Sequence, residues 1–297
     1  MADRRALAAG LTTVAAWGSA FVAIRAGGRV LSPGALALGR LVVSCAILSG
    51  VAIVRRERLP PRSALLPTAV FGVLWLGVYS VTLNAAERHV DAGTAAMVVN
   101  TGPLLIALLA GVLLQEGFPR RLLAGCAVAL LGCVAIGLSS GSRSAGIGGF
   151  ALLVIATLAY AVAVVVQKVA LRRASAFQVT WLGCLAALVV CLPFGPSLAR
   201  VDDARAVLWL VYLGAVPTAI GFATWSFALR RGEAGRVASL NYLIPLVAIL
   251  LGWAYLGEAP PPLAIGGGAL CLSGVVIARA RRRARDPDCT RFRRAEA

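Results

Sequence analysis

The sequence predicts an all-α integral membrane protein with ten transmembrane helices, arranged as two inverted five-helix repeats. Three observations lead to this prediction: the composition, the length of the apolar segments and an internal repeat. Hydrophobic residues make up 60% and charged residues only 14% of the 297-residue chain, and the mean hydropathy is +0.86. Because a soluble domain keeps about a quarter of its residues charged to cover its surface, the solvent of this protein must be lipid.

Ten segments are apolar enough to cross a bilayer, for which a helix needs roughly 20 residues. Short stretches rich in Arg, Pro and Gly separate them and leave no room for a soluble domain. The first segment has the flanks of a signal peptide, but it stays apolar as far as Ile24, so we expect it to be retained as a helix. The predicted spans are Leu7–Ala26, Gly34–Val54, Ala64–Ala86, Gly93–Leu114, Leu122–Ser139, Gly149–Leu171, Phe177–Phe194, Ala206–Leu229, Val237–Leu256 and Leu263–Ala278.

The basic residues indicate the orientation. If the amino terminus is inside, most Lys and Arg residues fall in inside segments, including the Arg281-Arg282-Arg283 stretch of the tail. The sequence therefore predicts a multi-pass protein of the cell (plasma) membrane with both termini in the cytoplasm. The net charge of +17 does not indicate nucleic acid as a partner, because the basic residues lie between apolar blocks instead of on one folded face.

The chain repeats itself after a shift of 142 residues, which places Gly72 on Gly214 without a gap across three helices. The same shift matches further positions that rarely coincide by chance in apolar helices. These pairs are Asp91 with Glu233, Pro103 with Pro245, Glu116 with Glu258, Gly125 with Gly267 and Gly132 with Gly274. A shift of 143 places Arg25 on Lys168.

Five spans per unit is an odd number, so the second unit enters the membrane from the opposite side. Inverted repeats of this kind are typical of transporters that work by alternating access. We expect a first repeat over residues 1–139, a short loop over 140–146, a second repeat over 147–280 and a basic cytoplasmic tail over 281–297.

These motifs resemble those of the EamA-type transporters of the drug/metabolite transporter superfamily, over nearly the whole chain. The first span carries Trp17-Gly18-Ser19-Ala20-Phe21 and the second Leu38-Gly39-Arg40. The fourth and ninth spans carry a Pro followed by a terminal Glu, as in Pro245 and Gly257-Glu258, although Gln115 replaces the usual Gly before Glu116. The resemblance implies ten helices around a central cavity, with the fifth and tenth at the periphery, and it does not identify the substrate.

Pro103 and Pro245 each break a backbone hydrogen bond in mid-membrane, so they indicate either a cavity-lining kink or a kink that neighbouring helices tolerate. Asn100 and Tyr242 lie three residues before them on the same face, and substrate contact and interhelical hydrogen bonding are both open for them. The full set of candidate substrate-binding residues is Trp17, Arg40, Tyr79, Asn100, Pro103, Tyr160, Trp225, Asn241, Tyr242 and Pro245.

Arg40 is the only charge deep inside a predicted span. It either hydrogen-bonds helix-end carbonyls or snorkels outward, or it attracts anionic groups into the cavity. Trp17 and Tyr160 lie too deep for an interfacial belt. Aromatic residues that recur every three or four positions, such as Trp75 with Tyr79 and Phe222 with Trp225, are more typical of packing. Glu87, His89 and Asp91 cluster at the outer end of the third span, where they either titrate during transport or form a solvated loop.

The leading functional hypothesis is a secondary transporter that exports small organic metabolites or drugs. No Walker-type phosphate loop is present, and no acid lies deep in a span, which favours neutral, zwitterionic or anionic cargo. We expect no catalytic residues, no metal and no cofactor, because the seven cysteines form no CxxC pair and the single histidine is peripheral. The expected partners are the lipid bilayer and a small-molecule substrate. A coupling proton, an exchanged substrate and a homodimer stay open.

Two other classes of function were weighed. A non-transporting interaction or regulatory protein on the same scaffold would bind a ligand without moving it across sealed vesicles. An intramembrane enzyme would need paired catalytic groups at membrane depth, and the sequence offers no such pair.

Overall fold

The computed structural model describes residues 4–102, 143–231, 241–258 and 261–279, together with scattered residues between 105 and 135. These residues are helical throughout apart from their short connections. Six of the described helices are long and apolar enough to cross a membrane, and two more apolar helices are shorter. The six are Leu7–Gly27, Pro33–Val54, Arg62–Ala86, Ile147–Leu171, Ala176–Leu198 and Ala204–Trp225. They confirm a multi-pass helical membrane protein. The predicted span Gly93–Leu114 lies partly, and Leu122–Ser139 mostly, outside the described residues.

Two helices of the first half, α2 (Pro33–Val54) and α5 (Ala92–Val99), begin at a residue whose side chain caps them. Ser32 accepts a hydrogen bond from the Ala35 N–H, and Pro33 occupies the first turn, where its missing N–H costs nothing. Asp91 likewise accepts from the Thr94 N–H. The elements are α1 (Arg4–Gly27), α2 (Pro33–Val54), α3 (Arg62–Phe71), η1 (Gly72–Tyr79), α4 (Ser80–Ala86) and α5 (Ala92–Val99).

The second half follows the same pattern. Ser175 and Gln178 form a reciprocal capping box at the start of the seventh predicted span. The elements are α8 (Arg143–Leu171), α9 (Ala176–Cys191), η2 (Leu192–Phe194), α10 (Gly195–Leu198), α11 (Ala204–Leu213), η3 (Gly214–Ile220), α12 (Gly221–Arg231), η4 (Asn241–Leu243), α14 (Ile244–Leu256) and α15 (Pro262–Arg279).

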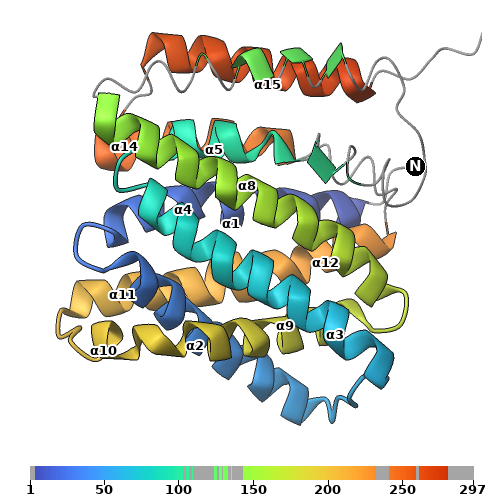
Figure 1. Ribbon diagram of the computed structural model, residues 1–297. Helices are drawn as coiled ribbons and strands as arrows, with labels where there is room; N and C mark the ends of the chain where they lie inside the picture. Colours follow the sequence, from blue (N-terminus) through green and yellow to red (C-terminus); the bar gives the residue numbers. More distant parts are fainter. Residues whose placement is uncertain are drawn as a thin grey trace, which may run out of the picture.

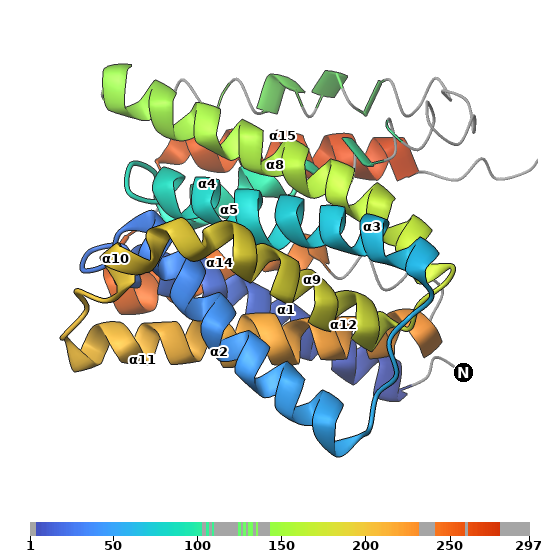
Figure 2. The same cartoon turned by 60° about the horizontal axis from the view of Figure 1, so that its bottom comes forward.

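The helices lie side by side in one bundle with their axes broadly along one direction (Figures 1 and 2). The helix α15 lies at the edge of this bundle, where it packs against α5 (Figure 1). Helices of the two halves are interleaved, since α1 packs against α12 and α14, and α8 packs against α3 and α4. The core is therefore shared between the halves.

Two π-helical segments, η1 and η3, interrupt the third and eighth spans. They begin at Gly72 and Gly214, the two glycines that the repeat matches. Gly72 lies directly against the backbone of Gly183 in α9, and Gly214 lies directly against the backbone oxygen of Arg40 in α2. At each crossing a side chain on the glycine would collide with the facing helix, so a residue without a Cβ is what permits the approach.

Pro245 differs from the prediction of a kink in mid-helix. The structure places it in the first turn of α14, immediately after the short 3₁₀ segment η4. At this position proline interrupts no hydrogen bond of the helix that it starts. Its counterpart Pro103 lies outside the described residues.

Candidate substrate cavity

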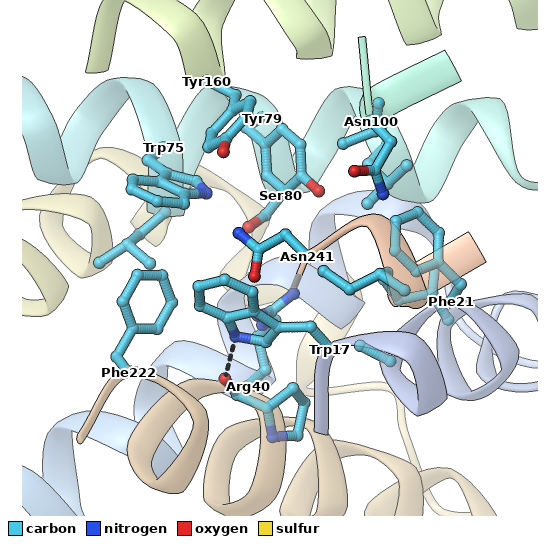
Figure 3. Close-up of a pocket in the computed structure, with 17 residues that line it drawn as sticks. Trp17, Phe21, Arg40, Trp75, Tyr79, Ser80, Asn100, Tyr160, Phe222 and Asn241 are labelled. Carbon is cyan, nitrogen blue, oxygen red and sulfur yellow. Dashed lines mark hydrogen bonds between the residues drawn. The ribbon is translucent and has the colours of Figure 1, made fainter. Parts of the chain in front are cut away.

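A cavity lies among α1, α2, η1, α8, η3 and the start of α14 (Figure 3). Its empty space, counted with its opening, is about 750 Å³. Its lining is mostly apolar and aromatic with a few polar groups, which is typical of a small-molecule site.

Aromatic rings form one wall of the cavity (Figure 3). The ring of Trp75 lies 4.8 Å from that of Tyr160 and 5.2 Å from that of Phe222, measured between centroids, and Trp17 lies 5.3 Å from Phe222. The indole N–H of Trp17 donates to the backbone oxygen of Pro217 at 3.0 Å, which fixes that ring against η3. The wall is thus an apolar surface with defined ring orientations.

Arg40 brings a positive charge to the cavity from α2. Its side chain is only 7% exposed, so it does not snorkel to the membrane surface. Its Nη2 and Nε donate to Oγ1 of Thr218 at 2.9 and 3.3 Å, and the Thr218 hydroxyl in turn donates to the Leu213 carbonyl at 2.9 Å. Arg40 takes part in neither ion pair between described residues, since these join Arg25 and Arg29 to Glu258. Arg40 therefore faces the cavity with a neutral hydroxyl as its recorded acceptor.

Polar side chains complete the lining. Asn100 follows the last residue of α5, and Asn241 opens η4, and each is 7% exposed. In Figure 3 Asn241 lies between Trp17 on one side and Tyr79 and Ser80 on the other. The Oδ1 of Asn241 is buried and accepts no hydrogen bond from the described part of the chain. A buried acceptor without a donor is available to a ligand N–H.

The structure brings six of the ten predicted site residues together around this cavity: Trp17, Arg40, Tyr79, Asn100, Tyr160 and Asn241. Trp225 does not line it, although its ring lies 5.4 Å from that of Trp17. Pro245 is buried at the start of α14 and is not part of the lining. Pro103 and the side chain of Tyr242 lie outside the described residues.

Three aromatic lining residues are absent from the predicted set: Phe21, Trp75 and Phe222. Trp75 and Phe222 were assigned to packing, yet both face the cavity (Figure 3). Trp75 lies four residues before Tyr79, which was a candidate, so the shared helix face was the signal that could have identified it. Among the described residues, no group of three or more His, Cys, Asp or Glu side chains could hold a metal ion.

A bundle of apolar helices around a small cavity with apolar and polar walls is typical of membrane proteins that bind small molecules. The EamA-like transporter family matches residues 4–138 and, a second time, residues 147–280. The chain belongs to this family, as its motifs predicted.

Several proteins named as probable or uncharacterized transporters are similar to the chain. A probable terminal-alkyne amino-acid exporter of Streptantibioticus cattleyicolor is 36% identical over 89% of this chain and 90% of its own length. A probable amino-acid metabolite efflux pump of Salmonella typhimurium is 27% identical, over 90% of this chain and 92% of its own. An uncharacterized transporter of Archaeoglobus fulgidus is 30% identical over 89% of this chain and 95% of its own length. A solved crystal structure shares the fold with a TM-score of 0.67 at 23% identity, covering 94% of this chain and 98% of that one.

Proposed function

We propose that this protein exports small amino-acid-like molecules across the plasma membrane by alternating access. The observation that carries the proposal is the charge of Arg40 in a cavity whose other lining residues are apolar, aromatic or neutral polar. A buried cation favours an anionic group on the cargo. Both charged groups lose their hydration in the cavity, and the charge-assisted hydrogen bonds between them compensate for that loss.

The cavity offers a separate contact for each part of an amino acid. The guanidinium of Arg40 suits a carboxylate, which it can bind with two parallel hydrogen bonds. The Oδ1 of Asn241, which accepts no hydrogen bond from the described residues, suits an ammonium N–H, and the neighbouring Trp17 ring adds a cation–π surface. The wall around Trp75 and Phe222 suits an apolar side chain. The names of the Streptantibioticus and Salmonella relatives, an amino-acid exporter and an amino-acid metabolite efflux pump, agree with this chemistry.

The proposal includes ten helices in two inverted repeats, bounded as the sequence predicts, with both termini in the cytoplasm. The paired crossings support it. Gly72 contacts Gly183, and Gly214 contacts Arg40. The shift of 142 places Gly72 on Gly214, and the shift of 143 places Arg40 on Gly183, so the two contacts are equivalent in the repeat. Each half therefore makes the same contact with the other half, as an inverted pair would. Two equivalent halves can exchange conformations and open the cavity to opposite sides. The family and the relatives' names favour transport over catalysis.

Transport into proteoliposomes tests the proposal, with radiolabelled phenylalanine and leucine as first probes. We expect uptake of the amino acid above that of empty liposomes. Unlabelled amino acid should compete, whereas its methyl ester and its decarboxylated amine, which lack the carboxylate, should not. Equal competition by the amine, or no uptake of any amino acid in a wider panel, would overturn the proposal.

The variant Arg40→Gln tests the role of the charge. A hydrogen bond to a charged group contributes about 1.5–3 kcal/mol, so we expect the apparent affinity for the amino acid to fall about tenfold to a hundredfold. Arg205→Gln, which removes an exposed Arg beyond the cavity, is the matched control and should transport normally. Unchanged affinity in Arg40→Gln would exclude Arg40 from carboxylate binding.

A further inference from the structure

Glu87 carries a buried carboxyl group that has no hydrogen-bond partner among the described residues. The residue directly follows α4, at the end of the span Arg62–Ala86, and its side chain is 1% exposed. Neither Oε1 nor Oε2 accepts a hydrogen bond from the described residues. An ionised carboxylate in that setting would be strongly unfavourable, because it would have lost its water and gained no donor.

The groups around Glu87 come from three other segments. Arg25 at the end of α1 donates from Nη1 to the backbone oxygen of Glu87, so its guanidinium lies beside this residue. Its Nε, however, bonds both carboxylate oxygens of Glu258, at 3.2 and 3.1 Å, and Arg29 reaches Glu258 at 3.2 Å. Asp91 uses both its oxygens to cap α5. The nearby cation is thus engaged by another acid.

Burial without a hydrogen-bond donor among the described residues favours the neutral form of Glu87 in this conformation. Burial raises the pKa of the Glu87 carboxyl well above its ordinary value of 4.5. Arg25 opposes this rise in pKa, whereas the negative charges of Asp91 and Glu258 add to it. The neutral form therefore depends on Arg25 remaining with Glu258.

We propose that Glu87 is a proton-binding site, occupied while the Arg25–Glu258 ion pair is closed and emptied when Arg25 leaves Glu258. On opening, the O–H bond of Glu87 breaks, the proton passes to water, and the carboxylate that remains pairs with the freed guanidinium of Arg25. The ion pair joins the end of α1 to the end of α14, and it lies one residue beyond Ile24, which lines the cavity. Opening this end of the cavity is thereby linked to release of a proton.

Infrared spectroscopy of the full chain in lipid nanodiscs tests the proton site, since a protonated carboxylic acid has its own carbonyl stretch. We expect that band at neutral pH in the native protein and expect Glu87→Gln to lack it. Asp202→Asn, which removes an exposed carboxylate in the loop before α11, should retain it. Absence of the band in the native protein, or its persistence in Glu87→Gln, would overturn the assignment.

Glu258→Gln tests the link to the ion pair. Without the competing carboxylate, Arg25 is free to pair with Glu87, so the band should titrate at lower pH than in the native protein. An unchanged titration midpoint would show that Glu87 is not coupled to the ion pair. These measurements need no substrate, so they stand or fall separately from the proposed cargo.

Thermal unfolding gives a second readout on folded material. The native state binds a proton at Glu87 that the unfolded chain releases above pH 4.5. Stability is therefore fully present below that pH and is lost as the pH rises towards the raised pKa of Glu87. The melting temperature should fall by about 3 °C per pH unit in this range, and Glu87→Gln should remove that part of the slope. An equal slope in native protein and Glu87→Gln contradicts the proposal.

Discussion

Replacement of Gly72 by Ala tests the close crossing between η1 and α9 directly. A Cβ built at Gly72 would lie well inside 3.0 Å of the carbonyl group and Cα of Gly183, a distance that real Cβ atoms do not reach. The obstacle is backbone, which cannot rotate away as a side chain can. The two helices must therefore separate, and the aromatic wall carried by η1 must move with them.

The magnitude follows from two opposing terms. Overpacking a tight contact costs about 1–3 kcal/mol, and a backbone obstacle places this crossing at the upper end. Exchange of Gly for Ala in a helix returns about 1 kcal/mol through the better helix propensity of Ala. The net loss in the free energy of unfolding is about 2 kcal/mol, which corresponds to a drop of about 4–8 °C in the melting temperature.

Gly50→Ala is the matched control, because Gly50 lies in α2 and a Cβ there meets no atom within 4 Å. Thermal unfolding of both variants in the same nanodiscs separates the crossing from the general effect of Ala. We expect Gly50→Ala to be at least as stable as the native protein. If Gly72→Ala unfolds at the same temperature as Gly50→Ala, the two backbones do not approach as described.

Two further substitutions test single hydrogen bonds. Asp91→Ala removes the N-cap of α5 and should lower the free energy of unfolding by about 1 kcal/mol, measured by denaturant titration; Asp202→Ala serves as the control and should leave it unchanged. Trp17→Phe keeps an aromatic ring in the cavity but loses the donor to the Pro217 oxygen, with an expected cost of about 1 kcal/mol. Trp253→Phe, at a side chain that is 67% exposed, is its control, and equal losses in the two variants would assign the effect to ring size instead.

The helices were predictable because lipid imposes a composition that few other environments demand. The first predicted span, Leu7–Ala26, and the second, Gly34–Val54, differ from the observed spans by one residue at an end. Arg40 and Trp17 stood out for the same reason, since a charge or a large polar ring is rare in mid-span. Their contacts with Thr218 and Pro217 were not predictable, because these partners lie some two hundred residues away in sequence.

The parts that sequence could not supply depend on local backbone geometry and on distant packing. The i→i+5 hydrogen bonds of η1 turn the residues after Gly72 away from the faces that an α-helix would give them, and the apolar pattern of the third span did not predict this π-helical segment. Pro245 follows apolar residues that resemble a helix interior, which hid the start of α14. Glu87 sits in a short polar segment typical of a solvated loop, and only packing from other helices buries it.

The glycine crossings carry a consequence for how the chain is assembled. Two close backbone approaches join one half of the chain to the other, through Gly72 with Gly183 and through Gly214 with Arg40. Neither half of the chain can therefore complete these crossings alone. If the halves are the two repeats that we propose, a product encoding one repeat would need a second copy to supply the facing helix, whereas one fused chain supplies both.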